Sequence, residues 1–213
     1  NSDKKIRFFK THNMLVRFKN SYFTDTKNTL GTIYIVRDPR NVITSVKNHY
    51  ELDNNQAIKW ITNEKQFLYN TYKVKESGYS DFQFISSWKL NYKSWIVQKK
   101  IPVKLIKYED LLNQTYSVFI DIISFINKIT NTNGKINKIK IKEILRSTTF
   151  EKLKKNEQDK GFSEAIISNK NKNKKITFFN LGPENDWKKI LNKDTREKLE
   201  EIFKKELVEL SYL

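Results

Sequence analysis

Arg37 and Ser45 are the two side chains whose types and spacing best fit chemistry on an anion. Arg37 directly follows the apolar run 33–36 and precedes an Asp-Pro turn, after which Ser45 falls in the first turns of an expected helix. Ligands of open α/β sheets collect where strands end and helices begin. There a guanidinium can bind a phosphate through two parallel hydrogen bonds, and a hydroxyl can add another. The spacing predicts a phosphate site, the alternative being a strand-to-helix corner with a surface arginine.

Lys10 and His12 form a second pair with chemical potential, at the end of the stretch RFFKTH. If this stretch is a strand, residues i and i+2 project to the same side. An imidazole that titrates near neutrality can accept a proton, while an ammonium beside it stabilises developing negative charge. Next to a phosphate site on a neighbouring strand, the pair indicates general-base chemistry. Without such a site, it indicates only two polar residues that close a strand.

Strands alternate with helices along the chain, and this order must position both pairs. Strands are predicted at Ile6–Lys10, Ile33–Val36 and Val103–Lys107. Helices are predicted after Asn54 with Ile58, Ile61, Phe67 and Leu68, after Ser87 with Trp88, Tyr92, Trp95 and Ile96, over Tyr116–Ile126, and from near Asp194 with Glu197 in a capping box. The pattern predicts an α/β fold with three layers, in which helices cover both faces of a mostly parallel sheet. A single domain over residues 1–213 is expected.

Residues 156–185 interrupt this alternation. The segment is polar, rich in Lys and Asn, and has few apolar residues. Long irregular segments in compact domains are usually lids or flexible loops. We therefore predict a lid or flexible loop over 156–185.

Composition narrows the function classes. The chain has no Cys and only two His, which excludes disulfides and thiolate nucleophiles and argues against a His-rich metal site. No apolar run approaches the ~20 residues that span a bilayer, which favours a cytoplasmic protein without integral membrane association. The net charge of +17 is typical of nucleic-acid binders, but only 6 of the 41 basic residues are Arg, and the basic residues are scattered. No nucleic-acid partner is predicted.

Six segments, in this order along the chain, resemble the PAPS-dependent sulfotransferases of the cytosolic type. They are KTH at 10–12, IYIVRDPRNVITS at 33–45, SWKLNYKSW at 87–95, KYEDL at 107–111, TTFEKLKKN at 148–156 and FFNLGPENDWKK at 178–189. The resemblance implies a sulfotransferase fold of the P-loop NTPase type. It also implies PAPS (3′-phosphoadenosine 5′-phosphosulfate) as sulfuryl donor, no metal, and a hydroxyl or amine of a small-molecule, carbohydrate or lipid acceptor.

The resemblance assigns a role to each matched position. His12 would be the general base, and Lys10 would stabilise charge on the transferred group or the leaving phosphate. Arg37 and Ser45 would bind the 3′-phosphate of the nucleotide. The other cofactor contacts would come from Tyr108, Thr148, Thr149 and Phe150 at the adenine end, and from Asn180, Leu181 and Gly182 at the 3′-phosphate.

The chain departs from the family's pattern at several places. Asn180 and Leu181 stand where the family has Arg and Lys, so two cationic contacts are missing unless lysines such as those at 172, 174 and 175 replace them. Asn91 stands where the family frequently has His, which is expected to alter the acceptor pocket.

Two further departures concern activity and assembly. No phosphate-cradling loop of the Pro-Lys-Ser-Gly-Thr-Thr-Trp kind precedes Lys10, which predicts an N-terminally truncated chain that lacks the P-loop strand and is inactive or severely impaired. Asn192 and Lys193 replace the central apolar pair of the family's short dimer motif, so dimerisation is left open.

Two other classes of protein stay open at this point. One is a P-loop nucleotide or small-molecule kinase, which shares the fold but gives no reason for KTH, Ser45 and DWK to occur together. The other is a basic nucleic-acid-binding protein, which predicts tight and steeply salt-dependent binding. The sequence shows no stacking motif or basic recognition helix that would favour it.

Overall fold

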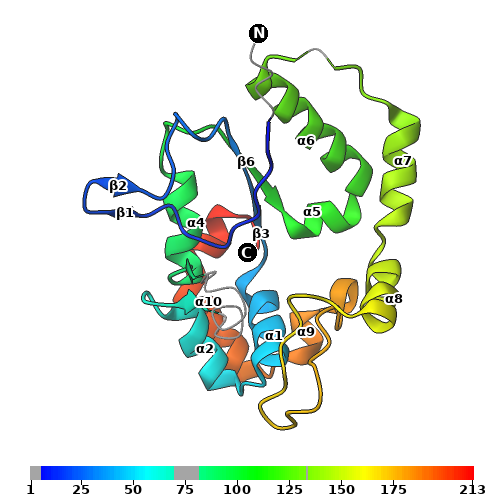
Figure 1. Ribbon diagram of the computed structural model, residues 1–213. Coiled ribbons are helices and arrows are strands. Elements are labelled where there is room, and N and C mark those ends of the chain that lie inside the picture. The colour runs from blue at the N-terminus through cyan, green and yellow to red at the C-terminus, as the bar shows by residue number, and fades with distance from the viewer. Residues whose placement is uncertain (1–5, 70–81, 133) are drawn as a thin grey trace.

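The computed structural model describes residues 6–69, 82–132 and 134–213, and Figure 1 shows their arrangement. In chain order the elements are β1 (Arg17–Phe18), β2 (Ser21–Tyr22), β3 (Thr32–Val36), α1 (Pro39–Tyr50), α2 (Asn54–Thr62), β4 (Phe67–Leu68), β5 (Gln83–Phe84), α4 (Trp88–Ile96), β6 (Val103–Lys107), α5 (Tyr108–Asn113), α6 (Thr115–Thr130), α7 (Lys138–Ser147), α8 (Phe150–Lys160), the 3-10 helix η1 (Gly182–Glu184), α9 (Trp187–Ile190) and α10 (Lys193–Glu209).

A parallel pair of strands, β3 and β6, forms the centre of the fold. The register runs from Thr32 opposite Val103 to Val36 opposite Lys107. Both strands were predicted from their runs of β-branched and other apolar residues. Because parallel strands end at the same edge, Arg37 and Tyr108, which follow β3 and β6, emerge side by side. The other ladders of the described residues, β1–β2 and β4–β5, are antiparallel and two residues long.

The predicted first strand, Ile6–Lys10, is wrong. These residues take no regular structure, and Phe8 and Phe9 are 74% and 84% exposed. A strand is stable only when its backbone groups pair with a neighbour. Among the described residues, no ladder partner lies beside this stretch. The apolar and aromatic residues of this stretch therefore did not suffice to predict a strand.

Helices pack on both faces of the β3–β6 pair, but the face opposite Tyr34 is only partly covered, because Ile35 on it is 53% exposed. On one face, Tyr34 and Leu105 pack with Tyr92 of α4 and Leu210, which follows α10. On the other, α6 approaches so closely that a Cβ at Gly31 would lie 2.7 Å from Ile129 Cδ1. The fold is thus mixed α/β, with a parallel pair at its centre and helices around it.

The largest apolar core lies between α1, α2 and α10. Ile43, Ala57 and Leu199 are fully buried within it. The helix predicted through residue 68 ends at Thr62, and Phe67–Leu68 instead pairs with β5. The last helix starts at Lys193, because the Asn192 side chain accepts a hydrogen bond from Thr195 N and caps it there, rather than a capping box at Asp194.

The segment 161–181 follows α8 and has little regular structure beyond a bridge between Ile167 and Lys175. Because α8 continues to Lys160, irregular structure begins five residues later than the sequence suggested. Two carboxylates hold the segment. Glu51 accepts hydrogen bonds from Ser168 Oγ and from the amides of residues 169 and 170, and Glu157 accepts from the amides of 178 and 179. Whether the segment acts as a lid remains a prediction.

Candidate active site

Arg37 lies at the end of β3 with its guanidinium stacked on an aromatic ring. Its Cζ is 4.2 Å from the centroid of the Tyr108 ring, and its terminal nitrogen donates a long 3.5 Å hydrogen bond to Gly182 O. Within the described residues, the buried Nε has no hydrogen-bond partner. Burial lowers the pKa of Arg37, although Tyr108 and Glu109 oppose this. A half-buried cation with a donor left over fits an anionic ligand.

Phe150 and Gly182 complete this group, which we call the Arg37 cluster (Arg37, Tyr108, Phe150, Gly182). Gly182 has φ +52°, and a Cβ there would lie 2.2 Å from Phe150 Cε2. Glycine is therefore required both by the backbone conformation and by the closeness of the ring. The structure brings together four of the predicted cofactor-binding residues, drawn from four distant parts of the chain.

Ser45 lies on α1, eight residues after Arg37, and is exposed. Its hydroxyl accepts a 3.0 Å hydrogen bond from Asn185 Nδ2. The same amide donates to Asn41 O at 3.1 Å and accepts from the Thr44 hydroxyl. Asn185 is buried and fixes the chain after Gly182 onto α1. Sequence reasoning missed Asn185, and its place directly before the DWK motif was the signal available.

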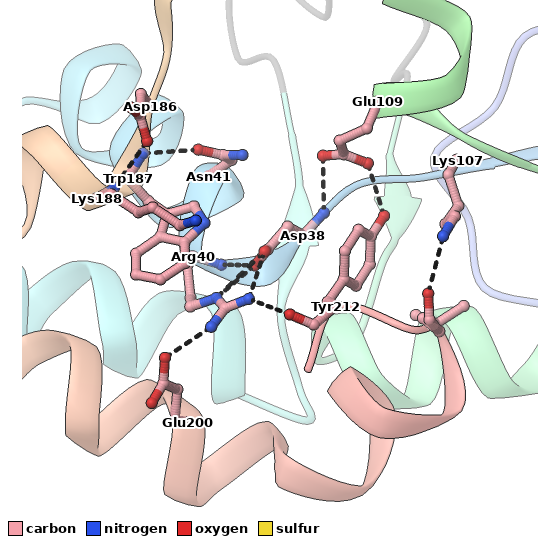
Figure 2. Close-up of polar contacts among 11 residues, drawn as sticks. Asp38, Arg40, Asn41, Lys107, Glu109, Asp186, Trp187, Lys188, Glu200 and Tyr212 are labelled. Atoms are coloured by element: carbon pink, nitrogen blue, oxygen red, sulfur yellow. Dashed lines mark hydrogen bonds and ion pairs between the residues drawn. The ribbon is translucent and has the colours of Figure 1, made fainter. Parts of the chain in front are cut away.

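The N-terminus of α1 is already capped. The Asp38 carboxylate accepts a hydrogen bond from Arg40 N at 2.8 Å and is paired with the Arg40 guanidinium, as Figure 2 shows. The sequence predicted that helix amides at this point would face an anion, but the Asp38 side chain takes that place. An anion at this edge would therefore be bound by the Arg37 side chain rather than by the first turn of α1.

Thr148 and Thr149 are exposed and belong to helix ends. The Thr148 hydroxyl donates to Ile144 O at 3.0 Å, and the Thr149 side chain caps α8 by accepting from Lys152 N. Their hydroxyls are thus used locally. The structure places them next to Phe150 in the chain but gives them no contact with Arg37.

Asn180 and Leu181 line two cavities, of about 600 and 490 Å³. Lys154 lies in the smaller one, where its Nζ donates to Asn180 O at 3.2 Å and lies 5.8 Å from the Phe150 ring centroid. Lys154 is a cation that sequence reasoning overlooked, because it is distant in sequence from 180–181. The residues proposed as replacements, at 172, 174 and 175, are exposed.

Lys10 and His12 lie near a carboxylate of the 161–181 segment. Lys10 Nζ is 2.5 Å from Glu164 Oε1, and both side chains are largely exposed. Burial and the Lys10 charge lower the pKa of His12, and Glu164 raises it. His49 lies one turn after Ser45 on α1. Burial lowers the pKa of His49, and the charge of Glu164 partly offsets this by raising it. Glu164 therefore faces both the Lys10–His12 pair and the Ser45 side of α1.

We expect His12 to titrate below its ordinary pKa of 6.5, so that the imidazole is neutral at pH 7. Removal of the neighbouring positive charge in Lys10→Gln should raise the His12 pKa, because the imidazolium is then less repelled. Glu164→Gln should lower it further. The chain has two histidines, so an NMR titration resolves both, and Lys10→Gln leaves His49 as an internal reference. A His12 midpoint above 6.5 in the wild type would contradict this prediction.

No group of three or more His, Cys, Asp or Glu side chains that could hold a metal ion occurs in the part of the chain that the structure describes. Nor, in the same residues, is any helix long and apolar enough to cross a membrane.

Comparison with known proteins gives one consistent class. A model of the sulfotransferase domain matches residues 1–211, and the chain belongs to this family. It is 25% identical to luciferin sulfotransferase of Photinus pyralis over 211 residues, which is 97% of this chain and 52% of that protein. The chain thus spans about half the length of this curated relative. Family membership does not favour the kinase or nucleic-acid-binding alternatives.

A solved structure supports the fold. Mouse sulfotransferase SULT7A1, crystallised with PAP, superposes with a TM-score of 0.52 at 17% sequence identity, over 85% of this chain and 59% of that one. At this identity the likeness concerns the fold alone. It agrees with the mixed α/β arrangement around β3 and β6 described above.

Proposed function

We propose that the Arg37 cluster binds PAPS for transfer of its sulfuryl group to a hydroxyl or amine of a small acceptor. That the chain is inactive or severely impaired because it lacks a phosphate-cradling loop stays a prediction. The observation that carries the proposal is the half-buried Arg37 guanidinium. It is stacked on Tyr108, a terminal nitrogen donates to Gly182 O, and its Nε has no partner among the described residues. Family membership supports sulfuryl transfer, and the PAP in the mouse relative supports a 3′-phosphoadenosine nucleotide as the ligand class.

The cofactor-binding residues of the proposal are those the resemblance implied. Arg37 and Ser45 would hold the 3′-phosphate, with the amides near Gly182 on its other side. Tyr108 and Phe150 would offer aromatic surfaces to the adenine, with Thr148 and Thr149 beside it, and Asn180 and Leu181 would lie at the 3′-phosphate. Gly182 has no side chain, so a ligand can come close to its backbone, and within the described residues Arg37 has a donor without a partner. Both features fit a ligand that carries phosphate groups.

In the proposed reaction, His12 accepts the proton of the acceptor hydroxyl while the acceptor oxygen attacks sulfur. The new sulfur–oxygen bond forms as the bond from sulfur to the phosphate oxygen breaks, and PAP leaves. PAPS, as a substrate, supplies the sulfuryl group. Lys10 would stabilise the negative charge on the transferred group or on the leaving phosphate once its exposed ion pair with Glu164 exchanges.

We expect PAP to raise the melting temperature of the chain. At 100 times its dissociation constant, a ligand that binds only the folded state adds about 2.7 kcal/mol of stability. Adenosine 5′-monophosphate, which lacks the 3′-phosphate, is the matched control and should give a much smaller shift, and so should ATP. Thermal denaturation with each nucleotide measures this. Equal stabilisation by ATP and PAP would count against the proposed donor and favour a kinase-like site.

A further inference from the structure

The backbone that carries His12 is held mainly by side chains, with one main-chain hydrogen bond nearby, from Met14 N to Phe84 O of β5 at 2.9 Å. His12 N donates to Gln83 Oε1 at 2.7 Å, and His12 O accepts from Asn91 Nδ2 at 3.0 Å. Further along, Leu15 N donates to Ser94 Oγ, and Asn13 O accepts from Trp95 Nε1. Three of these partners, Asn91, Ser94 and Trp95, lie on one face of α4, which thereby fixes the course of residues 12–15.

Asn91 is the member of this face with the most partners. Its Nδ2 donates both to His12 O and to Ile85 O, at 3.0 and 2.8 Å, and its Oδ1 accepts from the Tyr34 hydroxyl at 2.8 Å. Tyr34 is on β3, three residues before Arg37. A single amide therefore ties the His12 backbone, the chain before α4 and the strand that carries Arg37.

The chemistry of this position requires an amide. Two carbonyl acceptors and one hydroxyl donor converge on this side chain, and an Asn amide supplies the two donors and the acceptor that they need. A carboxylate has no donor when ionised, and a neutral imidazole has one donor and one acceptor. The histidine that is frequent here in the family could therefore not make the three contacts that Asn91 makes in this chain.

We propose that Asn91 is a positioning residue that fixes His12 at the site of proton transfer and in register with Arg37. The inference rests on the proposed role of His12 as the base. Asn91 itself makes no contact with the reacting atoms; it acts by holding the His12 carbonyl while Gln83 holds the His12 amide. The charged groups that act on the imidazole lie outside α4: Lys10 is two residues before His12, and Glu164 is in the 161–181 segment.

The test compares Asn91→Leu and Asn91→Ala with Tyr34→Phe. The first two remove all three hydrogen bonds without adding a charge, and Ala adds no bulk if Leu impairs folding. Tyr34→Phe keeps both donors of Asn91 and removes only the bond to β3. NMR titration of His12 is the readout, His49 is the internal reference, and the PAP-induced shift in melting temperature reports on the nucleotide site.

In the Asn91 variants, we expect the His12 pKa to rise toward 6.5 as the ring moves away from the surroundings that lower its pKa, while His49 and the PAP-induced shift stay unchanged. Tyr34→Phe should leave the His12 pKa near its wild-type value. A His12 titration unaltered in both Asn91 variants would overturn the positioning role. A wild-type chain that PAP does not stabilise would instead count against the proposed function, so the two failures are distinguishable.

Discussion

Arg40→Met is expected to lower the free energy of unfolding by about 3–5 kcal/mol. Arg40 is 2% exposed and forms a paired set of hydrogen bonds with the Asp38 carboxylate, at 2.8–3.2 Å. It also donates to Glu200 and to Tyr212 O, and its Cζ lies 3.9 Å from the Trp187 ring centroid (Figure 2). Methionine would fill part of the space but leave the Asp38 carboxylate buried without its cation, and chemical denaturation measures the cost.

Two matched variants isolate the cause of this loss. Asp38→Asn keeps a good helix cap and removes the buried charge, so the double variant with Arg40→Met should recover much of the lost stability. Glu200→Gln removes the ion pair between Arg40 and a partly exposed carboxylate. This change should lower the free energy of unfolding by at most about 1 kcal/mol. A double variant as unstable as Arg40→Met alone would show that lost packing, rather than an unpaired carboxylate, carries the effect.

Four elements were predictable from the sequence. β3, β6, α4 and α6 follow from local apolar patterns, and all four occur close to the predicted bounds. The failures are elements whose fate depends on distant partners. Ile6–Lys10 has a strand-like pattern but no ladder partner among the described residues, and the helix expected through residue 68 gives way to β4 because Phe67 and Leu68 pair with β5.

The residues of the candidate site fall into the same two groups, those that the sequence places correctly and those that depend on distant contacts. Arg37 and Tyr108 come together because parallel strands end at one edge, which the sequence order implied. Lys10 and His12 were placed together by a strand that does not form, yet each is acted on by Glu164 of the 161–181 segment. The contacts of Glu164, and of Asn185 with α1, join residues more than a hundred positions apart. No local pattern encodes such contacts, so sequence reasoning could not find them.

Arg37→Met is expected to abolish most of the stabilisation by PAP without lowering the melting temperature of the free protein. Charge-assisted hydrogen bonds contribute roughly 1.5–3 kcal/mol each, so loss of one such contact weakens PAP binding by about 10–100-fold. The free protein loses little, because Arg37 makes one long hydrogen bond to Gly182 O and leaves its buried Nε unpaired within the described residues.

Arg17→Met is the matched control for this change. Arg17 also lies over a tyrosine ring, with its Cζ 5.2 Å from the Tyr22 centroid, but on the exposed β1–β2 hairpin. Arg17→Met should leave PAP binding unchanged. A loss of affinity in Arg37→Met alone would then show that PAP binding depends on the position of Arg37 and not on the overall positive charge. Isothermal titration with PAP gives both affinities. If Arg37→Met binds PAP as tightly as the wild type, Arg37 does not contact the nucleotide. The half-buried cation would then serve only the fold.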